Sequence, residues 1–203
     1  MKRAVFLDRD GVINAMVYNT EFGLVDSPAN PREFSLLPEV PEAIRLINDL
    51  GFLAVVISNQ PGIAKGKFSP ALLEAMTHQM LSGLAVHGAI IDSIYYCFHH
   101  PEGAIEHYRK VCDCRKPKPG MLLRASEELG IALDQSYFVG DGITDMQAGK
   151  AVGTTNILVY SSFKCYICEQ LNRYNVQPDY TVGSLHDGIR LIQKLETVNE
   201  RPR

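Results

Sequence analysis

The chain lacks a long apolar run: none of its hydrophobic stretches approaches the roughly 20 residues that a membrane-spanning helix needs. It also lacks a basic excess, since 20 lysines and arginines stand against 23 aspartates and glutamates. That balance argues against a general nucleic-acid-binding surface. No charged and then apolar leader precedes the first predicted strand, so we expect no signal peptide and a cytoplasmic location. Neither a membrane nor a nucleic acid is therefore expected as a partner.

Cysteine is scarce, and its number, five, is odd. In a reducing compartment, such cysteines are better explained as metal ligands or packed thiols than as a disulfide framework. Internal repeats and low-complexity tracts are also missing. The 203 residues, 46% of them hydrophobic, are enough for one domain with a full core. We expect a single domain over residues 1–203, and a monomer by default.

Short apolar runs alternate with helical patterns along the chain. The runs that predict strands are Ala4–Leu7, Phe52–Ile57, Ile90–Tyr96, Tyr137–Val139, Asn156–Val159 and Tyr180–Val182. The patterns that predict helices are Pro41–Leu50, a helix capped by Ser69, Pro119–Leu129, Thr144–Ala151, Phe163–Asn172 and Ser184–Leu195. This alternation predicts an α/β fold whose parallel sheet has helices on both faces. Two segments without periodicity, residues 14–38 and 99–119, are expected to be long functional loops.

Aspartates follow two of the predicted strands. Asp8 and Asp10 come after the run Ala4–Leu7, and Asp141 follows Tyr137–Val139. The ends of parallel strands share one edge of the sheet, where open α/β folds bind ligands. Carboxylates gathered there can hold Mg²⁺, and one can attack phosphorus while another moves a proton. The alternative is a set of ordinary acidic turns, and for Asp145 a helix-capping role is sufficient.

Two further segments carry groups suited to phosphate. Ser58 lies at a predicted strand tip, where a hydroxyl and backbone amides can bind phosphate oxygens, although on this segment alone an ordinary turn is the favoured explanation. Lys116 precedes Pro117, which restricts its backbone to extended conformations. A fixed ammonium beside a phosphoryl group offsets charge in the transition state, and the alternative is a solvated basic turn. For Lys118 we adopt the solvated interpretation.

Sulfur and imidazole ligands form two close pairs, Cys97 with His99 and Cys112 with Cys114. Such a Cys₃His set suits a tetrahedral Zn²⁺ with no open position, which is a structural site. It would pin an irregular loop that has little core of its own. Packed reduced thiols are the alternative, and His100 and His107 are rival ligands. We interpret the isolated pair Cys165 and Cys168 as helix-packing thiols.

Taken in order, these motifs resemble the haloacid dehalogenase-like phosphatases. Within that superfamily the resemblance is to the branch of histidinol-phosphate and D-glycero-D-manno-heptose 1,7-bisphosphate phosphatases, and it extends from about Arg3 to Val159. The aspartate motif alone is weakly specific. The same motif together with the cysteine pattern that runs into Cys114-Arg115-Lys116-Pro117 is specific to this branch. The resemblance implies a Rossmann-like parallel sheet without a large cap domain and with a zinc-pinned loop.

The resemblance also assigns roles to individual residues. Asp8 would be the nucleophile and a Mg²⁺ ligand, and Asp10 the general acid and base with its backbone carbonyl on the metal. The remaining roles would be phosphoryl binding by Ser58 and Lys116, substrate binding by Asn59, Gln60 and Arg115, the last protein ligand of Mg²⁺ from Asp141, and structural zinc on Cys97, His99, Cys112 and Cys114.

These assignments predict a Mg²⁺-dependent phosphatase that acts on a small phosphorylated sugar through an aspartyl-phosphate. Heptose 1,7-bisphosphate or a similar sugar phosphate is the leading substrate, and histidinol phosphate is the alternative. A hypothesis of another class is a zinc-loop interaction module on an inactive phosphatase scaffold. Two departures concern the substrate: the heptose enzymes carry a lysine where this chain has Gly142, and the loop over residues 14–38 is longer here.

Overall fold

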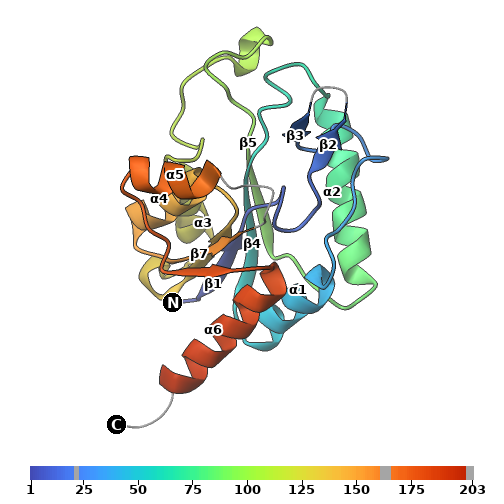
Figure 1. The fold of residues 1–203 in the computed structure, drawn as a ribbon. Coiled ribbons are helices and arrows are strands. Elements are labelled where there is room, and N and C mark those ends of the chain that lie inside the picture. Colours follow the sequence, from blue (N-terminus) through green and yellow to red (C-terminus); the bar gives the residue numbers. More distant parts are fainter. Residues whose placement is uncertain (21–22, 161–165, 200–203) are drawn as a thin grey trace.

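The computed structural model describes residues 1–20, 23–160 and 166–199. Its main sheet has six parallel strands in the order β5-β4-β1-β6-β7-β8 (Figure 1). Their bounds are β1 Ala4–Leu7, β4 Leu53–Asn59, β5 Ser93–Cys97, β6 Tyr137–Gly140, β7 Thr155–Val159 and β8 Tyr180–Val182. All six predicted strands are confirmed, and so is the α/β fold class. The first strand of the chain lies in the middle of the sheet, between β4 and β6.

Helices cover both faces of this sheet (Figure 1). On one face, α1 (Val40–Asp49), α2 (Pro70–Ala85) and α6 (Leu185–Asn199) contribute side chains to the hydrophobic cluster that contains Val5 and Leu7 of β1. On the other face, α3 (Gly120–Leu129) and α4 (Ile143–Val152) contribute side chains to the cluster that contains Ala4 and Phe6. Successive side chains of a strand point to opposite faces, so an unbroken apolar run is what a strand buried on both sides requires.

The helix ends follow the signals in the sequence. The Ser69 hydroxyl accepts a hydrogen bond from the Leu72 amide at 3.3 Å and caps α2. Gly130, with φ of 69°, ends α3 in the left-handed conformation. The less regular pattern near residue 163 is α5 (Tyr166–Arg173). Cys165 and the side chain of Cys168 lie outside the described residues. Within the described part, no helix combines the length and apolar character required to cross a bilayer.

The loop expected over residues 14–38 holds an antiparallel pair of strands that the prediction missed, β2 (Val17–Asn19) and β3 (Leu24–Asp26). Each has three residues, and the side chains of β3 are exposed. A strand with no buried face leaves no alternating apolar pattern, so the sequence carries no signal for it. In the described part of this insert the hairpin is the only regular structure, and no large cap domain is present there.

The topology brings the candidate residues to one edge of the sheet. Asp8 follows β1, Ser58 and Cys97 lie at the ends of β4 and β5, and Asp141 follows β6. Because all four strands are parallel neighbours, their carboxyl ends meet there. The backbone amide of Asp8 donates to the Val139 carbonyl at 3.0 Å, which fixes β1 against β6 at the point where the site begins.

Candidate active site

Lys116 lies at the centre of the group. Its Nζ is 2.9 Å from Asp8 Oδ1 and 2.6 Å from Asp145 Oδ1, and it also donates to the Ile57 carbonyl at 2.9 Å. The residue is only 3% exposed. Burial disfavours the ammonium, but the two carboxylates outweigh it, so the pKa of Lys116 lies above its ordinary value. The chain therefore fixes a permanent positive charge beside Asp8.

Two carboxylates contact this ammonium, and a third, that of Asp141, lies beside them. Oxygen atoms of Asp8, Asp141 and Asp145 all lie within 4.8 Å of one another. Burial raises the pKa of Asp8 to about 7, Lys116 opposes the rise, and the charges of Asp145 and Asp141 add to it. Three carboxylates against one ammonium leave an excess of negative charge in a largely buried site. An all-oxygen donor set with that excess fits a divalent cation such as Mg²⁺.

Asp145 does more than the helix capping that its position suggested. Its Oδ2 accepts a hydrogen bond from the Gly142 amide at 3.0 Å, as a cap would. Its Oδ1 pairs with Lys116, and the side chain is 1% exposed. Gly140 makes this approach possible, since a Cβ there would lie 2.3 Å from the Asp145 Cβ. Asp145 was not predicted to join the carboxylate group, although its position four residues after Asp141 indicates that it could.

Four N–H donors hold the Asp10 carboxylate. Oδ1 accepts from Arg9 Nε at 3.0 Å, from Arg9 Nη2 at 2.8 Å and from Asn14 Nδ2 at 3.0 Å. Oδ2 accepts from Gln60 Nε2 at 2.8 Å. The orientation of this side chain is thus set by neighbours on both of its oxygens.

No role was predicted for Arg9 from the sequence, but the structure buries it fully. Its guanidinium carbon lies 6.0 Å from the centre of the Phe34 ring and 5.8 Å from that of the Tyr96 ring. Although burial disfavours the guanidinium, the neighbouring Asp10 and Tyr96 keep the pKa of Arg9 above its ordinary value. An arginine buried between aromatic rings and bound to Asp10 is a positioning residue of the site.

Three polar residues at the end of β4 and directly after it, Ser58, Asn59 and Gln60, have different partners. Ser58 is 1% exposed, and Gln60 Nε2 donates to its hydroxyl at 3.1 Å as well as to Asp10. The Asn59 amide holds the backbone of Lys116: its Nδ2 donates to the Lys116 carbonyl at 3.1 Å, and its Oδ1 accepts from the Lys116 amide at 3.0 Å. Asn59 and Gln60 therefore support Lys116 and Asp10, and their predicted contact with substrate stays a prediction.

The residues around Lys116 bear out one expectation and leave one open. Lys118 pairs with Asp113 at 2.8 Å with its side chain 49% exposed, as a solvated lysine should. Arg115, predicted to bind substrate, is half-buried and donates from Nη1 to the His99 carbonyl at 3.4 Å. That contact attaches Arg115 to the cysteine and histidine cluster.

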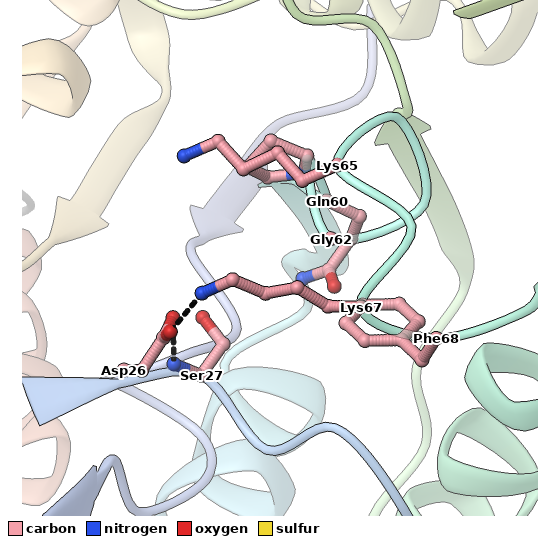
Figure 2. A pocket seen from close by; sticks show the side chains of 8 residues that line it. Asp26, Ser27, Gln60, Gly62, Lys65, Lys67 and Phe68 are labelled. Carbon is pink, nitrogen blue, oxygen red and sulfur yellow. Dashed lines mark hydrogen bonds and ion pairs between the residues drawn. The ribbon is translucent and has the colours of Figure 1, made fainter. Parts of the chain in front are cut away.

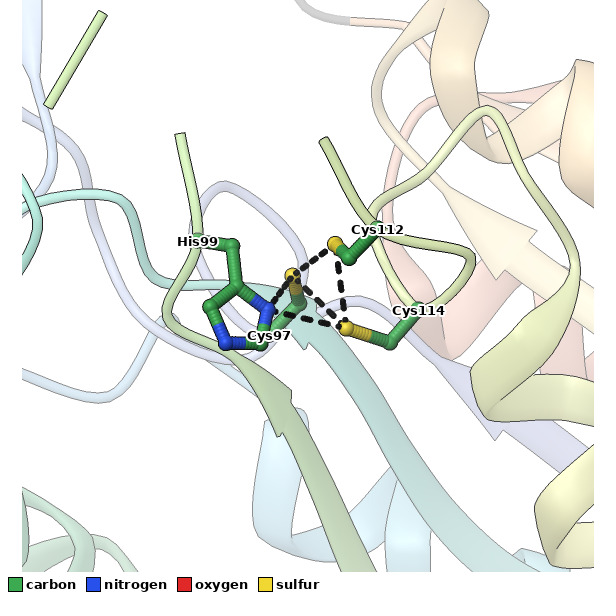
Figure 3. Close-up of side chains that lie close together, drawn as sticks. All are labelled: Cys97, His99, Cys112 and Cys114. Atoms are coloured by element: carbon green, nitrogen blue, oxygen red, sulfur yellow. Dashed lines mark hydrogen bonds between the residues drawn. The ribbon is translucent and has the colours of Figure 1, made fainter. Parts of the chain in front are cut away.

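The predicted zinc ligands lie together (Figure 3). Cys114 Sγ is 3.2 Å from the sulfur atoms of Cys97 and Cys112 and 3.3 Å from His99 Nδ1. Cys97 Sγ is 3.6 Å from Cys112 Sγ and 3.8 Å from His99 Nδ1. A zinc tetrahedron with bonds of about 2.3 Å to sulfur has edges of about 3.8 Å, so the arrangement is compatible with a zinc site. The rivals His100 and His107 lie outside this cluster.

Comparison with known proteins gives a consistent result. A family model described as HAD-hydrolase-like matches residues 113–188. The D-glycero-β-D-manno-heptose-1,7-bisphosphate 7-phosphatase of Escherichia coli K12 is 46% identical over 191 residues, which are 94% of either chain. The enzyme of the same name from Pasteurella multocida is 40% identical over 97% of this chain and 100% of its own.

Solved structures agree with these relatives. The D,D-heptose 1,7-bisphosphate phosphatase of B. bronchiseptica, solved with magnesium and phosphate, superposes with a TM-score of 0.78 at 28% identity. The match covers 96% of this chain and 99% of that one. The sequence resemblance is thereby confirmed, and the chain is a phosphatase. It belongs to the haloacid dehalogenase-like family, in the branch of the heptose 1,7-bisphosphate phosphatases.

Proposed function

We propose that this enzyme removes the 7-phosphate of D-glycero-β-D-manno-heptose 1,7-bisphosphate. The observation that carries the proposal is the Lys116 ammonium at 2.9 Å from Asp8 Oδ1, inside a group of three carboxylates. The name and close similarity of the Escherichia coli relative support the choice of substrate. The intact set of charged groups speaks against an inactive scaffold that serves only as an interaction module.

Asp8 is the nucleophile in this proposal. One of its carboxylate oxygens forms a bond to the 7-phosphorus while the bond from phosphorus to the C7 oxygen breaks. Asp10 gives its proton to the leaving oxygen, then takes a proton from the water that attacks the aspartyl-phosphate. Phosphate leaves, and the Asp8 carboxylate is restored. Lys116 and Ser58 bind the phosphoryl oxygens, where the fixed ammonium offsets the developing negative charge.

Two metals complete the proposal. The carboxylates of Asp8 and Asp141 and the backbone carbonyl of Asp10 would hold Mg²⁺, with Asp145 within reach of the same position. When bound, Mg²⁺ supplies positive charge against the carboxylates and the phosphoryl group. The four ligands of the Cys97 cluster would hold a structural Zn²⁺ that pins the loop before Lys116. A single domain, a monomer and a cytoplasmic location stay predictions.

Phosphate release with Mg²⁺ tests the proposal directly. The purified enzyme is incubated with heptose 1,7-bisphosphate and, separately, with histidinol phosphate, and the position of the remaining phosphate is read by ³¹P NMR. We expect heptose 1-phosphate as the product, with a higher kcat/KM than for histidinol phosphate. An Asp8→Asn preparation controls for contaminating phosphatases. Preference for histidinol phosphate would overturn the substrate, and inertness toward both would favour the inactive scaffold.

A further inference from the structure

A second feature lies beside the reacting groups. A small pocket opens between the end of β3 and the segment that follows β4 (Figure 2). Its lining residues are Asp26, Ser27, Gln60, Pro61, Gly62, Lys65, Lys67 and Phe68. Phe68 lies directly on Gly62, where a Cβ would be 2.1 Å from its ring, so this wall of the pocket is closely packed. Two lysines in so small a pocket make it suited to an anion.

The pocket adjoins the reacting groups through Gln60. Gln60 is part of its lining, and the same side chain donates to Asp10 Oδ2 at 2.8 Å. In the proposed reaction Asp10 protonates the oxygen of the leaving group. In that reaction the part of the substrate beyond the broken bond would lie next to Asp10, on the side where Gln60 and the pocket are.

Lys67 is held by a partner that an anion can replace. Its ammonium pairs with Asp26 at the end of β3, and the two side chains are 43% and 53% exposed. Exposed ion pairs of this kind contribute little to stability because water screens both charges. A phosphate carries more negative charge than one carboxylate and more acceptor oxygens, so it would compete successfully for the ammonium.

A second lysine stands on the same turn. In Figure 2 the Lys65 side chain extends to the same side as that of Lys67, and the dashed line to Asp26 comes from Lys67. The Ile105 amide donates to the Ala64 carbonyl at 2.9 Å, which attaches this turn to the loop that follows Cys97.

We propose that Lys67, assisted by Lys65, binds a second anionic group on the leaving part of the substrate. When that group is absent, the Asp26 carboxylate pairs with the Lys67 ammonium. The inference rests on the proposed function, for which the second group is the 1-phosphate of the heptose. It makes Lys67 a determinant of selectivity between substrates with and without a distal phosphate.

The test compares two substrates that share the bond to be broken, heptose 1,7-bisphosphate and heptose 7-phosphate. For Lys67→Met we expect kcat/KM to fall about tenfold for the bisphosphate, which is the effect of one lost charge-assisted contact. For the 7-phosphate the fall should be at most about twofold. Lys65→Met lowers the ratio of kcat/KM for the bisphosphate to kcat/KM for the 7-phosphate in the same direction, by a smaller factor. Asp26→Asn, which frees Lys67, raises the ratio. Lys118→Met removes an exposed lysine elsewhere and leaves the ratio unchanged.

Lys67→Met lowers the kcat/KM ratio and Asp26→Asn raises it, and these opposite effects distinguish anion binding from a purely structural role of the ion pair. If their ion pair only fastened β3 to the loop, both variants would lose the same contact and change both substrates alike, and that result would overturn the inference. A wild-type enzyme that hydrolyses both esters with a ratio unaffected by Lys67→Met would overturn it while leaving the proposed function intact. A wild type inactive on both would overturn the two together.

Discussion

Replacing Arg9 with glutamine tests how the fold holds Asp10. The variant loses a fully buried cation whose two donors lie 3.0 and 2.8 Å from Asp10 Oδ1. Asp10 is then left as a buried carboxylate with only the amides of Asn14 and Gln60 as partners. Breaking one partner of a buried ion pair costs about 3–5 kcal/mol of unfolding free energy, because the remaining charge stays desolvated.

The loss should be visible in thermal unfolding. For a chain of this length each kcal/mol lowers Tm by about 2–4 °C, so we expect Arg9→Gln to unfold about 6–20 °C below the wild type. Arg124→Gln is the matched control, since Arg124 pairs with Glu128 on the surface at 68% exposure, and its Tm should stay within about 2 °C. Calorimetry on both variants gives the comparison. An Arg9 variant as stable as the Arg124 variant would refute the claim that Arg9 holds a buried Asp10.

Three further outcomes follow from the same site. Asp8→Asn should keep the fold and lower kcat by at least about 10³-fold, because an amide is a poor nucleophile; near-normal kcat in steady-state assays would count against it. Mild EDTA should stop turnover, and added Mg²⁺ should restore it, while elemental analysis still finds about one zinc per chain; a zinc-free preparation with full activity and unchanged melting would disprove the structural zinc. Gly142→Lys should raise kcat/KM for bisphosphates more than for monophosphates, by up to roughly 10–150-fold, since Gly142 has an ordinary negative φ that lysine accepts. Unchanged selectivity would show that the added charge does not reach the distal group.

The sequence predicted those features that have a local signature. Unbroken apolar runs marked strands buried on both faces, and Ser69 and Gly130 marked helix ends, because these patterns depend on near neighbours in the chain. The order of the strands was not predicted, since it depends on which strands pair across the sheet. The carboxylates could still be placed together, because parallel strands share their carboxyl edge whatever their order.

The residues that support Asp10 and Lys116 could not be predicted from local sequence pattern. Arg9 looked like any surface arginine, and its burial depends on Phe34 and Tyr96, which the fold brings from distant segments. The hydrogen bonds from Asn59 to the Lys116 backbone likewise join residues 57 positions apart. The exposed hairpin β2–β3 left no apolar alternation. What the sequence missed is therefore set by long-range packing.

The central claim is that Asp8 carries the phosphoryl group. The most direct measurement traps the covalent intermediate of the wild type during turnover, because Asp10 acts in both steps and its replacement would slow formation and hydrolysis alike. The enzyme is mixed with heptose 1,7-bisphosphate and Mg²⁺, quenched rapidly and treated with borohydride, which reduces an acyl phosphate to the alcohol. Peptide mass spectrometry should then find homoserine in place of aspartate at Asp8 and nowhere else. Reduction at another carboxylate, or none at Asp8 while phosphate is released, would contradict the account.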